Sequence, residues 1–199
     1  MPDDDRVVIA TGNPGKLREI VALLGEQNFA CIAQSELGVR PGPETGVTFV
    51  ENALQKARHA AARTGLPAIA DDSGIVVDAL EGRPGVYSAR YAGEGASDED
   101  NVDKLLAELG DVDERAAHFH CAAVFIRHTD DPEPVIAEAS WYGTITRERH
   151  GSGGFGYDPV FHVPACGCTS AELAPAKKNE LSHRGLAFRR LAQRLAVAR

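Results

Sequence analysis

The sequence of 199 residues predicts an α/β fold with a mixed, twisted central sheet flanked by helices. Short apolar runs typical of strands alternate along the chain with amphipathic segments typical of helices, which is the pattern of α/β proteins. Two longer apolar segments flank the turn Asp130-Asp131-Pro132, so we expect them to form an antiparallel pair. No repeat, low-complexity tract or linker is visible. We therefore expect a single domain over residues 1–199, with room for two lobes.

Six segments predict strands, because short apolar or β-branched runs bounded by Gly, Pro, Asp or Asn favour buried strands. The expected strands lie at residues 7–10, 29–33, 68–70, 75–77, 118–127 and 135–146. Between the third and the fourth lies Asp71-Asp72-Ser73-Gly74, a sequence with ordinary turn chemistry. A glycine-rich loop is expected at residues 150–159.

Four segments predict helices, and each begins at a residue type that caps helices. Asn13 precedes Pro14, which suits the first helical position. Thr48 and Glu51 have the spacing of a capping box. The expected helices cover residues 14–24, 48–63, 97–109 and 182–198, the last two beginning at serines.

Composition excludes several classes of protein. The net charge is −8 and the pI is near 5.4, whereas a general nucleic-acid binder more often carries a basic face. No apolar run approaches the roughly 18–20 residues needed to span a bilayer, and the acidic N-terminus is unlike a secretory signal. We therefore expect a cytoplasmic protein that binds neither nucleic acid nor a membrane. The four scattered cysteines are expected to be free thiols.

The loop Thr11-Gly12-Asn13-Pro14-Gly15-Lys16 links the first expected strand to the first expected helix. A strand, a glycine turn and a helix start make an anion site, because free backbone N–H groups and the positive end of the helix dipole point outward. Lys16 lies in the first turn, where a bound anion would offset its repulsion by the dipole. We expect this loop to hold a phosphorylated ligand. An ordinary glycine turn with a surface lysine is the alternative, and the spacing rules out a P-loop.

Adjacent carboxylates at Asp71 and Asp72 suggest a metal site. Neighbouring residues of a strand point to opposite faces, so we expect one acid to face the ligand and the other to take a structural partner. Oxygen ligands in a phosphate-binding protein favour Mg²⁺, for which Glu44 is a candidate second ligand. Lys56 projects from the expected second helix and can supply positive charge. The alternatives are a plain turn, an exposed glutamate and a surface lysine.

The segments near the C-terminus suggest a base-binding site. Residues 151–159 contain four glycines and two aromatics, and Phe155 can stack on a nucleobase. His183 and Arg184 can donate hydrogen bonds to a purine carbonyl or to phosphate. The alternatives are a mobile hairpin loop and a capped helix with exposed basic residues.

Together these segments resemble one family, the Ham1-like inosine/xanthosine triphosphate pyrophosphatases. The motifs occur in the family's order between residues 7 and 190, so the resemblance covers nearly the whole chain. Each motif is weak alone, but six in order are specific. They are Thr11 to Lys16, Glu44 to Gly46 with Thr48 to Ala53, Ala70 to Gly74, Gly85 to Tyr91, Phe155 to Pro159, and Ser182 to Gly185.

The resemblance implies a two-lobed fold with a substrate cleft between the lobes, and a homodimer. It implies Mg²⁺-dependent hydrolysis of ITP, dITP and XTP to the monophosphate and pyrophosphate. Asp72 matches the general base and metal-linked acid, and Glu44 the second metal ligand. The substrate-binding positions match Thr11, Gly12, Asn13, Pro14, Gly15, Lys16, Ser73, Phe155, Gly156, Tyr157, Asp158, Lys178, His183 and Arg184. We also expect Lys56 to bind the substrate, because its positive charge compensates the negative charge of a triphosphate.

Two other functions compete with this hypothesis. One is a Maf-like pyrophosphatase of related fold that acts on pyrimidine or modified nucleotides. The other is a nucleotide-binding regulatory module without catalysis, against which the paired acids argue. Product analysis over a panel of nucleotides separates the three.

Overall fold

The structure is a computed structural model that describes residues 6–25 and 30–197. Its strands are β1 (Arg6–Ile9), β2 (Ala30–Ala33), β3 (Ala68–Val77), β4 (Ala116–Ile126), β5 (Val135–Ile145), β6 (Phe161–Val163) and β7 (Cys168–Thr169). Its α-helices are α1 (Pro14–Leu24), α2 (Phe49–Thr64), α3 (Asp98–Leu109), α4 (Pro175–Leu181) and α5 (His183–Val197). No helix in this part of the chain is long and apolar enough to span a membrane.

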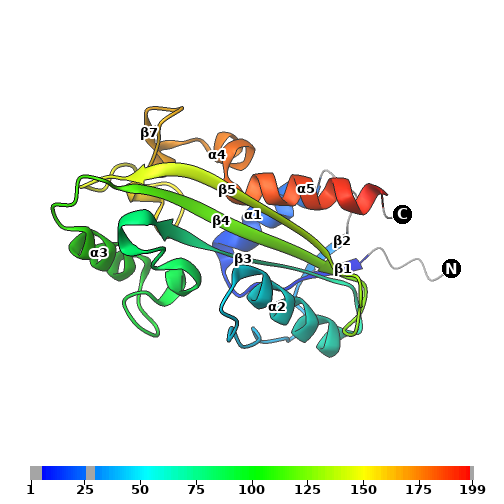
Figure 1. Cartoon of the computed structure of the whole chain (residues 1–199). Coiled ribbons are helices and arrows are strands. Elements are labelled where there is room, and N and C mark those ends of the chain that lie inside the picture. Colours follow the sequence, from blue (N-terminus) through cyan, green and yellow to red (C-terminus); the bar gives the residue numbers. More distant parts are fainter. Residues whose placement is uncertain (1–5, 26–29, 198–199) are drawn as a thin grey trace. The chain divides into compact units, whose positions relative to one another are not determined.

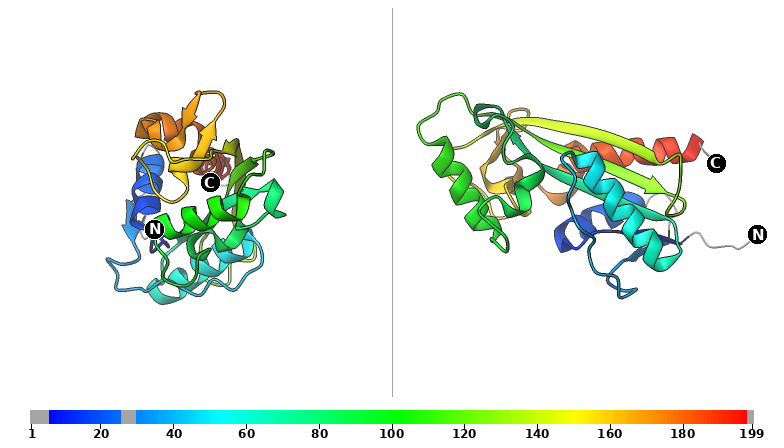
Figure 2. Two further views of the ribbon diagram at one scale, coloured as in Figure 1. Left: turned by 90° about the vertical axis from the view of Figure 1, so that its left-hand side faces the viewer. Right: turned by 60° about the horizontal axis from the view of Figure 1, so that its bottom comes forward.

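The strands form a seven-stranded sheet in the order β2-β1-β3-β4-β5-β6-β7 (Figure 1). β1 pairs in parallel with β2 and β3, whereas β6 pairs antiparallel with β5 and β7. β4 and β5 lie side by side (Figure 2), and the connection at residues 127–134 is too short for a parallel crossover. The predicted mixed sheet and antiparallel pair are thus confirmed.

The chain divides into two compact units. Unit 1 comprises Met1–Asp72, Cys121–Ala139 and Arg184–Arg199, and unit 2 comprises Ser73–His120 and Ser140–His183. The expectation of a single domain over residues 1–199 stays a prediction. The four cysteines are free thiols in the structure.

Unit 1 is built on the alternation of side chains along β1 and the start of β3. Val7, Ile9 and Ile69 pack with the apolar faces of α1 and α5. Val8 and Ala68 point the other way and pack with α2. The face of α2 is formed by small residues that allow close approach to the strands, namely Ala53, Ala57, Ala60 and Ala61. Figure 1 shows α2 on one side of these strands and α1 with α5 on the other.

Unit 2 has a more aromatic core. Phe119, Trp141 and Phe161 contact one another with ring centroids 4.6–6.5 Å apart. Helix α3 packs its buried Leu105 and Leu109 into the same cluster. This core supports the loop at residues 146–157 and the short helix that follows it.

One strand prediction is wrong in an instructive way. Asp71-Asp72-Ser73-Gly74 does not form a turn, because β3 runs unbroken from Ala68 to Val77. Both acids find cationic partners, so the strand tolerates them. The first three predicted helices are confirmed to within one residue, as is the start of the last at His183. Helix α4 and strands β6 and β7 were not predicted, while Phe29 and Ala198 lie outside the described residues.

Gly74 permits a close approach within unit 2. A Cβ at this position would overlap the Gly85 carbonyl oxygen and the Ser88 hydroxyl. That hydroxyl accepts a hydrogen bond from the Ile75 N–H at 2.9 Å and donates one to the Gly85 carbonyl at 2.6 Å. A side chain at residue 74 must therefore push this segment away from β3.

We expect Gly74→Ala to destabilise the protein by about 1–3 kcal/mol, because the backbone has to move to admit the methyl group. Gly25→Ala is the matched control, since Gly25 has helical φ and ψ and a Cβ added there would meet only open space. The control should be neutral or stabilising by up to about 1 kcal/mol. Urea unfolding measures both changes, and equal stabilities of the two variants would contradict the assigned contact.

Candidate active site

The two acids of β3 point to opposite faces of the strand. Asp71 continues the row of Ile69, which faces α1 and α5, and Asp72 continues the row of Ala68 and Ala70, which face α2. The two residues are only 1% and 5% exposed. Because a buried carboxylate needs cations or hydrogen bonds, each acid takes partners from the helices on its own side.

Asp72 meets two side chains of α2. The Lys56 ammonium donates to Asp72 Oδ1 at 2.8 Å and to Glu44 Oε1 at 2.9 Å. The Asn52 amide donates to Asp72 Oδ2 at 3.2 Å, and its oxygen accepts a hydrogen bond from the Gly46 N–H at 2.8 Å. The buried amide therefore joins the acid to the loop that carries Glu44.

Lys56 remains charged despite its burial. Desolvation disfavours the ammonium, but the negative charges of Asp72, Asp71 and Glu44 outweigh it and raise the pKa of Lys56. Asn52 and Lys56 are four residues apart on α2, so they project from the same helix face. Two oxygens from different segments thus converge on one fixed positive charge.

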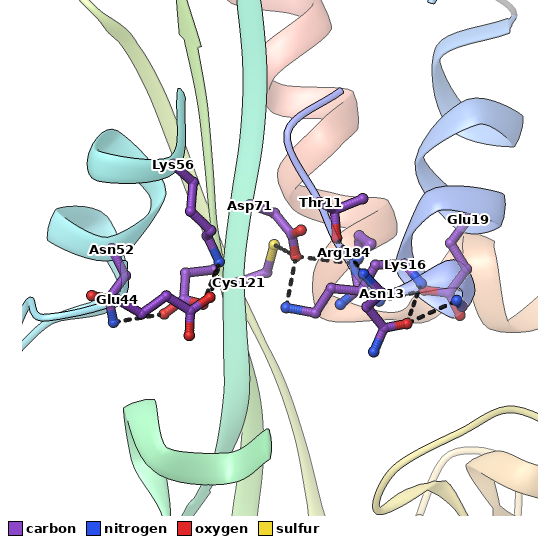
Figure 3. A network of polar contacts seen from close by, with 12 residues as sticks. Thr11, Asn13, Lys16, Glu19, Glu44, Asn52, Lys56, Asp71, Cys121 and Arg184 are labelled. Carbon is purple, nitrogen blue, oxygen red and sulfur yellow. Dashed lines mark hydrogen bonds and ion pairs between the residues drawn. The ribbon is translucent and has the colours of Figure 1, made fainter. Parts of the chain in front are cut away.

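Asp71 is held from the opposite side by α1 and α5. Arg184 Nε donates to Asp71 Oδ2 at 3.2 Å, and the Lys16 ammonium lies 3.6 Å from the same oxygen. Arg184 Nη1 also donates to Glu19 on α1. The Cys121 thiol lies 3.9 Å from Asp71 Oδ2. Figure 3 shows these side chains converging on β3 from the side away from Lys56.

The charges on this side stabilise one another. Burial alone would raise the pKa of Asp71, but Lys16, Arg184 and Lys56 outweigh it and hold that pKa well below its ordinary value. Burial likewise opposes the charge of Arg184, whereas Asp71 and Glu19 raise its pKa. Burial and the nearby Asp71 raise the pKa of Cys121, so this thiol stays protonated at neutral pH.

The predicted phosphate loop forms, with one correction. Asn13 caps α1, and its side chain accepts hydrogen bonds from the N–H groups of Gly15 and Lys16 at 2.8 and 3.0 Å. The Leu17 N–H bonds to the Asn13 carbonyl. The expectation of free N–H groups at this helix start is therefore wrong, because the cap satisfies them. The dipole, Lys16 and the exposed Gly12 remain available to an anion.

The oxygen ligands on the α2 side fit a divalent cation. Asp72 and Glu44 both reach the Lys56 ammonium, and Mg²⁺ commonly takes one or two carboxylates together with phosphate oxygens. Among the described residues, no group of three or more His, Cys, Asp or Glu side chains is arranged to hold a metal ion. Two protein carboxylates therefore leave the other ligand positions of such an ion to water and substrate.

In unit 2 the predicted substrate residues Phe155 and Lys178 both contact Asp158. Its Oδ2 accepts hydrogen bonds from the Phe155 N–H at 2.9 Å and from the Lys178 ammonium at 2.5 Å. Its Oδ1 accepts from the Ser170 hydroxyl at 2.8 Å. The Lys178 ammonium lies 4.8 Å from the centre of the Phe155 ring. Asp158 thus fixes the loop that presents this partly exposed ring.

Three further predicted substrate residues of unit 2 make contacts within the protein itself. The Tyr157 hydroxyl donates to the Ser88 carbonyl at 2.9 Å, and the Gly156 N–H donates to Asp98 at 2.7 Å. His183 is buried with its ring stacked on Phe119, at 4.7 Å between centroids. Through these contacts Tyr157, Gly156 and His183 stabilise the structure of unit 2. That they also contact the substrate stays a prediction.

Arg184 lies in unit 1, within the network around Asp71, and its residue is 2% exposed. Sequence reasoning placed it with His183 at a purine carbonyl, and that assignment stays a prediction. Ser73 follows Asp72 on β3 and is half-buried.

Sequence reasoning gave no role to Asn52 or Glu19. For Asn52 the available signal was its position four residues before Lys56, whereas no local spacing linked Glu19 to Arg184.

Comparison with known proteins connects this geometry to a family. The model of the Ham1 family matches residues 7–194. A protein of Pectobacterium atrosepticum named dITP/XTP pyrophosphatase is 57% identical over 195 residues, which cover 97% of this chain and 99% of that protein. A protein of the same name from Vibrio parahaemolyticus is 56% identical over 194 residues, covering 96% and 97%.

Solved structures agree with these relatives. A HAM1 protein from Coxiella burnetii superposes with a TM-score of 0.89 at 47% identity, covering 96% of this chain and 98% of that one. A dITP/XTP pyrophosphatase from Mycobacterium abscessus superposes with a TM-score of 0.74 at 40% identity, covering 94% and 98%. The predicted α/β fold is confirmed by these likenesses.

The depressed pKa of Asp71 predicts how stability depends on pH. An unfolded aspartate titrates near pH 3.9, so the ion pairs of Asp71 contribute fully above that pH and are lost as the pH falls toward the lower folded-state value. We expect Asp71→Asn to cost about 3–5 kcal/mol at neutral pH, since it leaves Arg184 incompletely paired. This difference from the wild type should shrink below about pH 4.

Urea unfolding between about pH 3 and pH 7 measures this difference. The exposed Asp130→Asn serves as the control for loss of one negative charge. A gap between wild type and Asp71→Asn that stays constant over this range would contradict the assigned ion pairs.

Proposed function

Since the chain belongs to the Ham1 family, we propose that it hydrolyses dITP, ITP and XTP to the nucleoside monophosphate and pyrophosphate. The observation that carries this proposal is the pair of adjacent, buried acids on β3, each with its own lysine. Such an arrangement suits the cleavage of a phosphoric anhydride, in which a water must be activated beside several negative charges.

The triphosphate binds at the start of α1 and between the two lysines. Its roughly four negative charges need compensation, which Lys16 and Lys56 supply together with the helix dipole. The exposed Gly12 lets the ligand approach the backbone closely. Release of pyrophosphate requires that the bond between the α- and β-phosphates breaks.

Asp72 is the base that orients the attacking water and accepts its proton. Asn52 and Lys56 each hold one of its oxygens, so the carboxylate presents a fixed direction. Asp72 and Glu44 would hold Mg²⁺, which would neutralise phosphate charge and the charge that develops during the reaction. General-base catalysis of this kind typically contributes a factor of about 10²–10⁴.

We assign selection of the base to Phe155, His183 and Arg184. Phe155 stacks on the purine, while hydrogen-bond donors, with His183 and Arg184 as candidates, read O6 of hypoxanthine or xanthine. Adenine carries a donor at that position, so a fixed donor would be left unpaired, and such mismatches can reach roughly 10⁴–10⁵ in discrimination. A homodimer and a cytoplasmic location complete the proposal. The homodimer rests on the resemblance of the sequence motifs, and the location rests on the acidic N-terminus and the short apolar runs of the sequence.

The decisive assay is pyrophosphate release from XTP, ITP, dITP, ATP, GTP and dTTP, with and without Mg²⁺. We expect release from the first three only, and only with the metal. Preference for dTTP would favour a Maf-like activity, and binding without release would favour a regulatory module.

Asp72→Asn should lower kcat at least about 100-fold, because it removes the base at similar volume. Asp131→Asn, at a buried acid bound to Arg127, should leave kcat unchanged.

Phe155→Ala should weaken all purine substrates alike, by about 1–3 kcal/mol, because stacking does not depend on the exocyclic groups. The comparison is kcat/KM for XTP and dITP. Tyr142→Ala removes an aromatic ring that is 72% exposed on β5 and serves as the control. A change in the XTP to dITP ratio in Phe155→Ala would show that this ring also selects the base.

A further inference from the structure

Of the two adjacent acids, only Asp72 has a place in the proposed reaction. Asp71 is 1% exposed, and its neighbours are Arg184, Lys16 and Cys121. We propose that Asp71 is a positioning residue, which fixes the Lys16 ammonium at the start of α1 and is itself fixed by Arg184. The proposal rests on the proposed function, since Lys16 is taken to contact the triphosphate.

Arg184 and Lys16 contact Asp71 in different ways. Arg184 Nε hydrogen-bonds to Asp71 Oδ2 at 3.2 Å and reaches Glu19 with Nη1, so Arg184 is clamped between two acids. The Lys16 ammonium, at 3.6 Å from the same oxygen, is close enough for an ion pair but too distant for a hydrogen bond. Asp71 therefore attracts Lys16 without binding its N–H donors, which stay available to phosphate.

Lys16 needs such an anchor for two reasons. The dipole of α1 repels a cation in the first turn, and the long lysine side chain has many rotamers. A buried anion behind the ammonium offsets the repulsion by the helix dipole. It also reduces the number of rotamers that the Lys16 side chain populates. The four charges of Asp71, Glu19, Lys16 and Arg184 sum to zero, so the anchor adds no net charge around the ammonium. A lysine placed in advance need not be ordered when the transition state forms.

Asp71 can act by positioning Lys16, by its charge alone, or by stabilising the fold. These three roles predict different kinetics for Asp71→Asn. Loss of a negative charge alone would tighten triphosphate binding and lower KM with kcat unchanged. Loss of the fold would reduce the amount of active enzyme whatever residue stands at position 16. Loss of positioning lowers kcat, and only when Lys16 is present to be misplaced.

The test is a double-mutant cycle between Asp71→Asn and Lys16→Ala, with kcat and KM for XTP measured for all four proteins. We expect Asp71→Asn to lower kcat by about tenfold with Lys16 present, and by less than about threefold in the Lys16→Ala background. Equal effects in the two backgrounds, or a lower KM at unchanged kcat, overturn the proposal. Asp131→Asn, the matched buried acid paired with Arg127, should show no coupling to Lys16.

A second measurement is independent of hydrolysis. Calorimetric titration of the same four proteins with inorganic triphosphate should show non-additive affinities, with a coupling of at least about threefold. A wild type that fails to hydrolyse XTP contradicts the proposed function, whereas additive affinities contradict the positioning by Asp71. If Asp71→Asn does not unfold cooperatively in urea, Asp71→Glu takes its place, because it keeps the charge and moves it by one methylene. The same coupling is then expected, and its absence overturns the proposal.

Discussion

The side-chain alternation of β3 is the constraint on which the site depends. A strand packed on both faces cannot turn two adjacent carboxylates to the same side, so Asp71 and Asp72 enter two different cores. An unpaired buried carboxylate costs several kcal/mol, so cations are required on both faces. Lys56 from α2 meets one acid, and Arg184 with Lys16 from α5 and α1 meets the other. The polar site is thus a condition for folding this strand, as well as a place for chemistry.

The packing of unit 1 follows from the same requirement. Helix α2 lies against the strands through alanines, which brings the stem of Lys56 and the amide of Asn52 close to Asp72. Larger residues at Ala53 or Ala57 would hold the helix away and leave the acid without its partners. On the opposite face, Arg184 lies in the first turn of α5, where Glu19 of α1 can reach it. The small residues of the core and the charges of the site therefore depend on each other.

Local sequence signals predicted the features that neighbouring residues determine, namely helix starts and long strands. The caps at Asn13 and Thr48 gave the starts of α1 and α2, and apolar runs gave the long strands. They failed at Asp71-Asp72-Ser73-Gly74, because the residues that make an extended conformation favourable lie elsewhere in the chain. Arg184 is 113 residues from Asp71, and no local pattern links them. The resemblance could place Asp72 and Glu44 in one site, but it could not identify the Asn52 amide that joins Asp72 to Gly46.

Charge balance explains why two lysines do not suffice for the proposed reaction. In the network of unit 1, four carboxylates (Glu19, Glu44, Asp71 and Asp72) face three cations (Lys16, Lys56 and Arg184). The network is thus negative by one before a triphosphate adds roughly four more charges. Arg184 is buried and pairs with Asp71 and Glu19, so its positive charge is already balanced by carboxylates. A divalent cation held by Asp72 and Glu44 would correct this balance, and it would compete with Lys56 for the same oxygens. Lys56 would then be available to pair with the phosphates, so binding of metal and substrate should be mutually favourable.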